Sequence, residues 1–587
     1  MFKIIKNLTI KDVLFCFIAL FFIVFQVYLD LKTPDYMSKI TELVTTGGLM
    51  KNILKQGGYM LLCTLGSLVC SVVVGYITAR VGTSFAKTLR RKIFIKVNSF
   101  NMGEIKGFST SSLITRSTND VMQVQNFITM GLQMVVRSPI MAIWAISKIA
   151  NKGFEFSVVT AGGVLVIIIM ITILLITVLP KFKVIQSLTD DLNNTTRENI
   201  SGIRVIRAFN AEKYHQKRFN KANESLTSVH MYIQKRMALM SPTMTIVMQG
   251  LSLGIYVIGV SLINGAALPQ DKITVFGNMV VFMSYAVQVI FSLIMLIVVF
   301  VFYPRASVSA TRINEVLETK NTIEDGTIDH DVNNIKGVVE FKNVSFKYPD
   351  ADEYILNNIS FTANKGETIA FIGSTGSGKS TLINLIPRFY DVSAGEVLID
   401  GINVKEMKLS YLYNKIGYIS QKPVMFKKSI SDNIAFGSNN GKKVNKKAIK
   451  EALDYAEASS FVDKLVGKEN YEIAQGGNNV SGGQKQRLSI ARAIARYPEI
   501  FIFDDSFSAL DYKTDYELRK NIKENLKDST VFIVAQRIGT IKDADKIVVL
   551  DNGSCVGIGT HKELLKKCKV YQEIAESQLS KEELKNA

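Results

Sequence analysis

The stretch Gly373-Ser374-Thr375-Gly376-Ser377-Gly378-Lys379-Ser380 decides how the second half of this chain folds. It fits the pattern G-x-x-x-x-G-K-[ST], which is the phosphate-binding P-loop. The apolar run 368–372 before it is typical of a buried strand, and residues 381–386 after it indicate the start of a helix. The motif requires this order of strand, glycine loop and helix, so the context argues against a chance match.

Each part of the P-loop has a chemical role. The glycines allow backbone N–H groups to close on phosphate oxygens, and the helix N-terminus adds the positive end of its dipole. We expect Lys379 to pair with the β- and γ-phosphates and the Ser380 hydroxyl to ligate Mg²⁺. The expected nucleotide-binding residues are Gly373, Ser374, Thr375, Gly376, Ser377, Gly378, Lys379, Ser380 and Thr381.

The chain has 587 residues, which is too long for one domain, and its charge is unevenly distributed. The formal net charge is +19. Residues 337–587 contain 36 Lys and Arg against 32 Asp and Glu, whereas residues 1–336 contain 34 against 19. Because the basic excess lies between long apolar runs, it indicates a membrane protein and not a nucleic-acid-binding one. The five cysteines have neither metal-ligand nor disulfide spacing.

Six apolar runs are long enough to cross a bilayer, which takes about 20 helical residues. They occupy residues 13–29, 59–78, 131–150, 156–179, 243–263 and 273–303. Six spans place both termini on the same side of the membrane. No small-residue cleavage site follows the first run, so we expect an uncleaved first span. Because the sequence begins almost at this span, we expect no appended protease or regulatory domain.

Two long connections, residues 79–130 and 180–241, are polar but keep a helical spacing of apolar residues. The first holds eight Lys and Arg against two acids, and the second holds eleven against five. The positive-inside rule places both in the cytoplasm, although the loop after the first span is a weak exception. We expect both connections to be helices that continue out of the membrane and turn back.

These patterns divide the chain into three parts. We expect a six-helix transmembrane domain over residues 1–320, an acidic linker rich in Asn, Asp and Gly over residues 321–336, and a soluble domain over residues 337–587. In the soluble part, apolar strands alternate with helices, which is typical of an α/β nucleotide-binding fold.

Two further patterns in the soluble part point to nucleotide chemistry. The apolar run 500–503 ends in Asp504 and Asp505, and a carboxylate there suits Mg²⁺ coordination; we assign that role to Asp504. The run Ser481-Gly482-Gly483-Gln484 precedes a helix and predicts a second anion-binding helix N-terminus.

With these motifs the chain resembles a half-transporter of the ATP-binding cassette (ABC) exporter type, over essentially its whole length. Residues 480–484 resemble the LSGGQ signature, with Val480 in place of Leu, and residues 508–511 resemble the D-loop. Gln421 resembles the Q-loop glutamine that senses Mg²⁺ and contacts the membrane domain. Residues 115–121 and 198–209 resemble the two cytoplasmic loops of drug exporters.

Tyr348 resembles the aromatic residue that stacks on adenine, although a lone tyrosine after a strand is also an ordinary structural residue. The resemblance implies ATP and Mg²⁺ as ligands and a second half-transporter as the partner. It also implies coupling segments between the two domains, which we place at residues 100–108 and 209–215.

The chain departs from the family at two positions. Asp505 stands where strong ATPase sites have Glu, and Gln536 stands where they have the switch histidine. Asp is one methylene shorter, and a misplacement of about 1 Å can cost on the order of 10²-fold in rate. Gln536 can donate a hydrogen bond but cannot carry a proton. Together the two departures resemble the degenerate half of heterodimeric exporters, in which Ser481 to Gln484 would complete the partner's site.

The expected function is therefore export of hydrophobic or amphipathic compounds across the plasma membrane of an AT-rich bacterium, with slow hydrolysis at this chain's own site. One alternative is a homodimeric exporter or lipid flippase that tolerates Asp505. Another, from a different class, is an ATP-binding regulatory or channel-like partner subunit. The near-intact signature argues against that class, because a pure regulator has no need to complete a partner's site.

Some polar residues lie inside the apolar runs. Arg137 is a functional candidate because charges at membrane depth are rare, but it can also snorkel or pair with an acid near the cytoplasmic face. Gln249, Asn278 and Gln288 can line a substrate cavity or form hydrogen bonds between helices.

Overall fold

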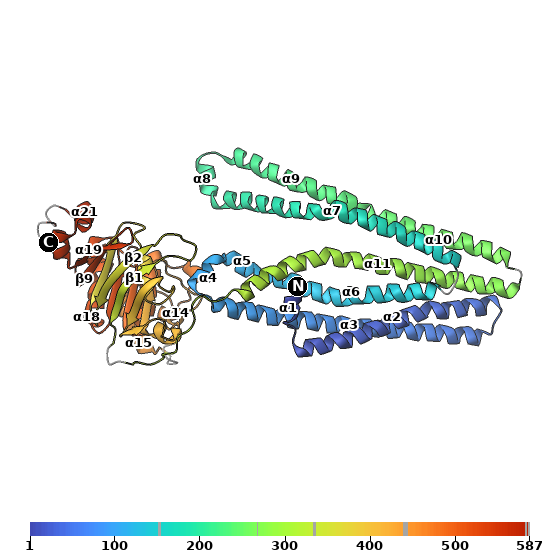
Figure 1. The fold of residues 1–587 in the computed structure, drawn as a ribbon, viewed down its shortest axis with the longest axis horizontal. Helices are drawn as coiled ribbons and strands as arrows, with labels where there is room; N and C mark the ends of the chain where they lie inside the picture. The colour runs from blue at the N-terminus through green and yellow to red at the C-terminus, as the bar shows by residue number, and fades with distance from the viewer. Residues whose placement is uncertain (151–153, 267, 333–335, 438–443, 581–583, 585–587) are drawn as a thin grey trace. The chain divides into compact units, whose positions relative to one another are not determined.

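The computed structural model describes residues 1–150, 154–266, 268–332, 336–437, 444–580 and 584 (Figure 1). The chain forms two compact units. The first unit comprises residues 1–97 and 110–318, and the second comprises residues 98–109 and 319–587.

The first unit is entirely helical in the part that the structure describes. Its elements are α1 (Phe2–Ile5), α2 (Ile10–Thr45), α3 (Met50–Asn98), α5 (Thr110–Thr115), the π-helical turn η1 (Arg116–Asp120), α6 (Val121–Ala150), α7 (Phe154–Ser201), α8 (Ile203–Ala208), α9 (Glu212–Ala238), α10 (Met240–Gly265) and α11 (Pro269–Glu318).

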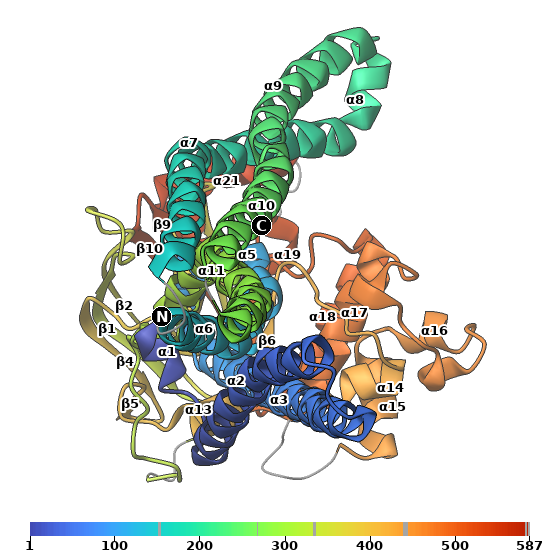
Figure 2. The same cartoon turned by 90° about the vertical axis from the view of Figure 1, so that its right-hand side faces the viewer.

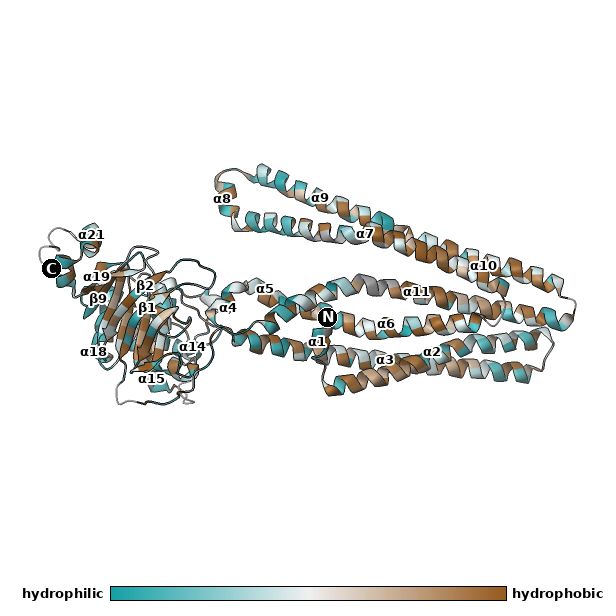
Figure 3. Ribbon diagram, in the orientation of Figure 1, coloured by the Kyte–Doolittle hydropathy of each residue, from teal (hydrophilic) through white to brown (hydrophobic). Residues whose placement is uncertain are grey.

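Six stretches of these helices are long and apolar enough to cross a membrane, as the sequence predicts. They are Ile10–Thr45, Met50–Asn98, Thr110–Ile149, Phe154–Val178, Glu212–Gly265 and Gln270–Leu296. Figure 3 shows that the ends of α7 and α9 next to α8 are mostly hydrophilic, whereas α10 is mostly hydrophobic. The expected helical extensions beyond the apolar runs are therefore present.

The extensions end in short helices. The helix α4 (Met102–Gly107) lies within the segment 100–108 predicted for coupling. The helix α8 lies just before the second predicted segment, 209–215, because Gly202 interrupts the long helix and α9 begins at Glu212. Figures 1 and 2 both show α7 and α9 lying side by side, with α8 connecting them at one end.

The apolar core of the first unit joins α2, α6, α7, α10 and α11. Tyr285 on α11 is fully buried there, and its hydroxyl lies 2.8 Å from both the Leu31 carbonyl oxygen and Asp35 Oδ1 on α2. Lys148 on α6 forms an ion pair of 2.9 Å with Asp35. A partly buried carboxylate of α2 thus has partners on two other helices, α6 and α11, which offsets the cost of its desolvation.

The second unit contains α4 and an α/β domain. The strands are β1 (Val339–Phe346), β2 (Leu356–Ala363), β3 (Thr368–Gly373), β4 (Ala394–Ile399), β5 (Ile402–Asn403), β6 (Ile416–Ile419), β7 (Ile500–Asp504), β8 (Thr530–Val534), β9 (Lys546–Asp551) and β10 (Ser554–Gly559). The longer helices are α13 (Leu409–Lys415), α15 (Lys446–Tyr455), α17 (Gly482–Ile494), α18 (Tyr512–Asn525), α20 (His561–Lys567) and α21 (Lys569–Gln578). The shorter helical elements are α12 (Lys379–Ile383), α14 (Ile430–Ile434), α16 (Ser459–Val462), α19 (Ile538–Ile541), η2 (Lys468–Asn470) and η3 (Gln475–Gly477).

The strands form one sheet in the order β5-β4-β1-β2-β10-β9-β3-β8-β7-β6. The five strands from β9 to β6 pair in parallel, whereas β1, β2, β4 and β5 pair antiparallel with one another. Apolar side chains cover both faces of the parallel part: Phe501 and Phe503 point into one core, and Ile500 and Ile502 into the other. Burial on both faces explains why these strands are continuous apolar runs in the sequence.

A buried cation holds the residues before the sheet against it. Lys415 at the end of α13 is 6% exposed, and its Nζ lies 2.8 Å from Asp331, 2.9 Å from Asp400 and 2.8 Å from Glu499. The hydrogen bonds from Lys415 and Tyr411 lower the pKa of Asp331 to about 2. Three carboxylates from separate segments therefore share one ammonium group.

We expect Lys415→Met to weaken this domain strongly, because three carboxylates lose their common cation. Removing one partner of a buried ion pair costs about 3–5 kcal/mol. Hydrogen exchange of the full-length chain, followed in peptides of β7 and β8, measures the loss of protection. Lys365→Met is the matched control, since the Lys365–Asp528 pair is exposed and should leave protection nearly unchanged. Equal effects of the two substitutions would contradict this account.

Candidate nucleotide site

Four loops from distant parts of the sequence meet at one edge of the parallel sheet. The P-loop follows β3, Gln421 follows β6, Asp504 ends β7 and Gln536 follows β8. Because these strands are parallel, their carboxyl ends lie side by side, which is where open α/β sheets bind ligands. The sequence pattern placed all four groups in separate motifs, and the topology brings them together.

The P-loop glycines are required by the close approach of the backbone to its neighbours. A Cβ atom at Gly373 would lie 2.0 Å from the Leu550 carbonyl oxygen, so no side chain fits there. Gly378 has φ +93°, a left-handed conformation that side chains disfavour, and a Cβ there would lie 2.7 Å from Leu356. The loop can therefore wrap closely around a phosphate group only with glycine at these positions.

Lys379 lies over the loop that it belongs to. Its Nζ donates to the Gly373 carbonyl at 2.9 Å and to the Ser374 carbonyl at 2.7 Å. Burial lowers the pKa of Lys379, with the Asp505 carboxylate opposing that shift. The ammonium group is thus partly desolvated and held at the mouth of the loop, which strengthens its attraction for a phosphate.

Ser380 and Asp504 form a pair of adjacent oxygen ligands. The Ser380 hydroxyl donates to Asp504 Oδ1 at 2.8 Å, and the Tyr418 hydroxyl lies 3.3 Å from Asp504 Oδ2. Burial raises the pKa of Asp504, and the two hydroxyl groups oppose that rise. Hydroxyl and carboxylate oxygens are ligands that Mg²⁺ prefers, so this donor set fits the metal expected with a nucleotide.

Asp505 is held by two amide side chains. Gln421 Nε2 donates to Asp505 Oδ2 at 3.1 Å, and Gln536 Nε2 donates to the same oxygen at 2.9 Å. Asp505 itself has φ +47°, which is uncommon outside glycine and lies next to the end of β7. Asp505 and Gln536, which differ from the residues of strong ATPase sites, therefore form one hydrogen-bonded group with Gln421, which matches them.

A cavity of about 270 Å³ lies among these groups. The P-loop residues Thr375, Gly376, Gly378, Lys379, Ser380 and Thr381 line it together with Gln421, Asp505, Gln536, Ile355 and Val534. A cation and exposed backbone N–H groups on one side are the donors that a triphosphate requires. In the described part of the chain, neither Tyr348 nor residues 481–484 line this cavity.

The signature residues lie on the exposed start of α17. Ser481 is the N-cap: its Oγ accepts from the Gln484 backbone N–H at 3.3 Å, and Gln484 Oε1 accepts from the Ser481 backbone N–H at 2.9 Å. This reciprocal capping box fixes the first turn of α17 while Gly482 and Gly483 leave its backbone uncovered. The helix predicted after Ser481 is therefore present, and the described residues of its first turn do not line this chain's own P-loop cavity.

Tyr348 lies beside the P-loop helix and beneath a cation from α4. Its hydroxyl is 3.0 Å from Thr381 Oγ1, and Lys106 Nζ lies 4.3 Å from the centre of its ring. Lys106 is also 5.4 Å from the ring of Tyr390. The expected adenine-stacking residue and the expected coupling segment thus contact each other, which sequence reasoning missed.

Other contributors were also missed from the sequence. Tyr418 lies three residues before Gln421, and its position near the end of β6 beside β7 places it near Asp504. Ile355 and Val534 line the cavity as ordinary apolar residues and carry no motif signal.

Comparisons with known proteins agree with this architecture. Residues 356–508 match the family described as ABC transporter, and residues 16–293 match the ABC transporter transmembrane region. An uncharacterized ABC transporter ATP-binding protein of Mycobacterium tuberculosis is 36% identical over 554 residues, which cover 94% of this chain and 93% of that protein. The uncharacterized ABC transporter ATP-binding protein YfiB of Bacillus subtilis is 36% identical over 576 residues, covering 96% of each.

An ATP-dependent lipid A-core flippase of Pseudomonas aeruginosa is 31% identical over 495 residues, covering 84% of this chain and 80% of that protein. The solved structure of a bacterial Atm1-family ABC exporter with ATP bound has a TM-score of 0.80 to this chain at 22% identity. The match covers 97% of this chain and 98% of that chain, so the two share a fold. The chain belongs to the ABC transporter family, as an exporter half-transporter that joins a membrane domain and an ATPase domain in one polypeptide and works with another half.

Proposed function

We propose that this chain is one subunit of a heterodimeric exporter whose own ATP site hydrolyses slowly. The transporter would move hydrophobic or amphipathic compounds outward across the plasma membrane. The observation that carries the proposal is the group formed by Asp505, Gln421 and Gln536, in which two amides donate to one carboxylate oxygen.

This geometry is poor for activating water. A general base must lie within hydrogen-bond reach of the proton that it removes, and Asp505 is one methylene shorter than the usual Glu. Its Oδ2 already accepts two hydrogen bonds. Gln536 supplies a neutral donor in place of a residue that can accept and return a proton. Binding and hydrolysis are thus separable here: the groups for phosphate binding are intact, while those for hydrolysis are altered.

The proposed binding roles combine the geometry of the P-loop cavity with the family resemblance of Tyr348 and the signature residues. Lys379 and the backbone of Gly373 to Gly378 hold the phosphates, and Tyr348 stacks on the base. Ser380, Asp504 and Gln421 hold Mg²⁺, with Thr381 beside them. Ser481, Gly482, Gly483 and Gln484 complete the ATP site of the partner half, and the position of the α17 N-terminus outside this chain's own cavity supports that role.

The remaining assignments concern organisation. We place the domain limits at residues 1–320 and 337–587, with 321–336 as the linker, and both termini and the ATPase domain in the cytoplasm. The basic excess of residues 79–130 and 180–241 supports this orientation.

A homodimeric exporter or lipid flippase is the second candidate. The 31% identity with a lipid A-core flippase favours it, because that relative matches most of this chain. An ATP-binding regulatory or channel-like subunit is less well supported, since the capped and exposed α17 N-terminus suits completion of a partner site. ATPase activity of the chain alone separates the first two candidates.

Lys379→Ala should weaken ATP binding by the full-length chain roughly 10- to 100-fold. The substitution removes charge-assisted hydrogen bonds to the phosphates, each worth about 1.5–3 kcal/mol. Equilibrium binding of a fluorescent ATP analogue gives the affinity. Lys520→Ala, which removes an exposed cation on α18, is the control and should bind normally. Unchanged binding in Lys379→Ala would disprove the phosphate role.

The chain alone should hydrolyse ATP slowly, and the double substitution Asp505→Glu/Gln536→His should raise its turnover on the order of 10²-fold. The longer carboxylate restores reach, and the imidazole restores a group that can exchange a proton. Steady-state phosphate release from the purified chain in nanodiscs measures both. Fast turnover of the unmodified chain would contradict the proposal and favour the homodimer.

In the assembled heterodimer, Ser481→Arg should abolish most ATPase activity, whereas Asp505→Asn should cost far less. Arg at position 481 places a bulky side chain where the partner's γ-phosphate would meet the α17 N-terminus. Asp505→Asn alters a carboxylate that already accepts hydrogen bonds from two amide side chains. Phosphate release at saturating Mg-ATP and equal expression ranks the two variants. The reverse ranking would mean that this chain hydrolyses its own ATP.

A further inference from the structure

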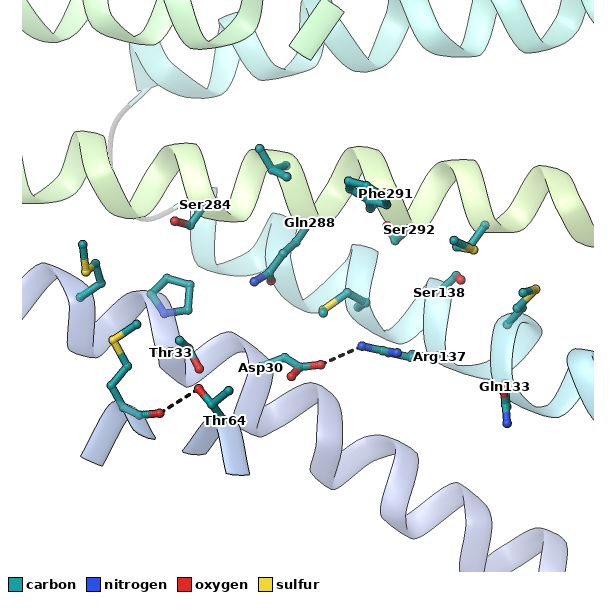
Figure 4. A pocket seen from close by; sticks show the side chains of 17 residues that line it. Asp30, Thr33, Thr64, Gln133, Arg137, Ser138, Ser284, Gln288, Phe291 and Ser292 are labelled. Carbon is teal, nitrogen blue, oxygen red and sulfur yellow. Dashed lines mark hydrogen bonds and ion pairs between the residues drawn. The ribbon is translucent and has the colours of Figure 1, made fainter. Parts of the chain in front are cut away.

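The membrane unit contains a cavity of about 850 Å³ whose walls come from α2, α3, α6 and α11 (Figure 4). This volume is within the range of ligand-binding pockets, roughly 300–1,000 Å³. Five of the lining side chains are methionines, at positions 37, 60, 134, 141 and 295. Methionine is flexible and polarizable, so this wall can accommodate alkyl chains of different shapes.

Among the described residues that line the cavity, only two are charged, and they carry opposite charges. Arg137 Nη2 lies 2.9 Å from Asp30 Oδ2, and the side chains are 42% and 20% exposed, respectively. Arg137 therefore pairs with an acid, which was one of the alternatives from the sequence. The cavity as a whole has no net charge.

Both members of the pair keep hydrogen-bonding capacity toward the cavity. Asp30 accepts a second hydrogen bond from the Ser67 hydroxyl at 2.5 Å. In the described residues, the Nε and Nη1 groups of Arg137 donate to no protein atom. Gln288 on α11 points toward the pair in Figure 4, and its buried Oε1 has no hydrogen-bond partner among the described residues.

The charge balance decides which head group fits. A purely anionic or purely cationic head group would leave one uncompensated charge beside a closed ion pair in a partly desolvated site, which is costly. A head group with both charges can place its acidic oxygens at Arg137 and its ammonium group at Asp30 and Gln288. That arrangement keeps the site neutral and satisfies the unused donors and the unpaired amide oxygen.

We propose that this cavity binds the zwitterionic head group of an amphiphile, with Arg137 holding the acidic part, Asp30 and Gln288 the ammonium part, and the methionine wall the alkyl chain. The inference rests on the proposed export function at one point: it assumes that the exported compound passes through this cavity.

Binding can be followed without ATP hydrolysis, because Trp144 is the only tryptophan of the chain. It lies two turns beyond Arg137 on α6, and its ring is 5.9 Å from that of Tyr28, two residues before Asp30. The full-length chain is placed in phosphatidylglycerol nanodiscs, whose lipid carries no ammonium group. Tryptophan fluorescence is titrated with myristoyl-lysophosphatidylethanolamine, myristoyl-lysophosphatidylglycerol and myristyltrimethylammonium, which share one chain length and differ in head-group charge.

The zwitterionic probe should bind at least about tenfold more tightly than either charged probe, a difference of about 1.4 kcal/mol. Arg137→Gln should reverse the order in favour of the cationic probe, and Asp30→Asn in favour of the anionic probe. The double variant Asp30→Asn/Arg137→Gln should remove the preference without creating a net charge. A stability defect alone cannot produce opposite changes in probe order.

The Lys148–Asp35 pair provides a matched control, since it joins the same two helices at similar exposure but does not line the cavity. Lys148→Gln should keep the zwitterion preference. Equal binding of the three probes to the unmodified chain, or an unchanged order in all variants, would overturn the proposal. Because no step requires hydrolysis or a partner half, the outcome is independent of whether the ATP site is degenerate.

Discussion

The parallel pairing of β3, β8, β7 and β6 is the constraint on which the nucleotide site depends. Each strand delivers one loop to the same edge, so residues separated by 84 and 124 positions meet within hydrogen-bond distance. The Ser380–Asp504 and Gln421–Asp505 bonds are direct consequences of that pairing. A shift of one residue in the register would turn the alternating Phe and Ile side chains of β7 toward the wrong cores and move both acids away from the P-loop.

In the membrane unit, two ion pairs join helices, as strand pairing joins the loops of the nucleotide site. Asp30 with Arg137 and Asp35 with Lys148 connect α2 and α6 at two heights, and Tyr285 adds α11 to the second pair. Apolar side chains in lipid give helices little preference for one axial position over another. Two pairs of opposite charge supply that preference, because sliding either helix would leave charges unpaired in a medium of low dielectric constant.

Local patterns predicted much of this molecule from its sequence. The P-loop, the six apolar runs, the strand before Asp504 and the capping motif at Ser481 are each contained in a short segment, so periodicity and residue type were sufficient. Contacts between distant segments could not be predicted in this way. Nothing near Arg137 in the sequence names Asp30 as its partner, and nothing near Lys415 indicates that three carboxylates surround it. The contact of Lys106 with Tyr348 likewise depends on how α4 packs.

The grouping of α4 with the ATPase domain has a mechanical consequence. The polypeptide passes between the two units three times, after residues 97, 109 and 318. A domain on one covalent connection has more rotational freedom than a domain held by three. Glu104 strengthens this arrangement, because it accepts hydrogen bonds from the Thr322 backbone and side chain and so joins the first excursion of the chain to the last. The ATPase unit is therefore continuous in the chain with three helices of the membrane unit, α3, α5 and α11, and not with α11 alone.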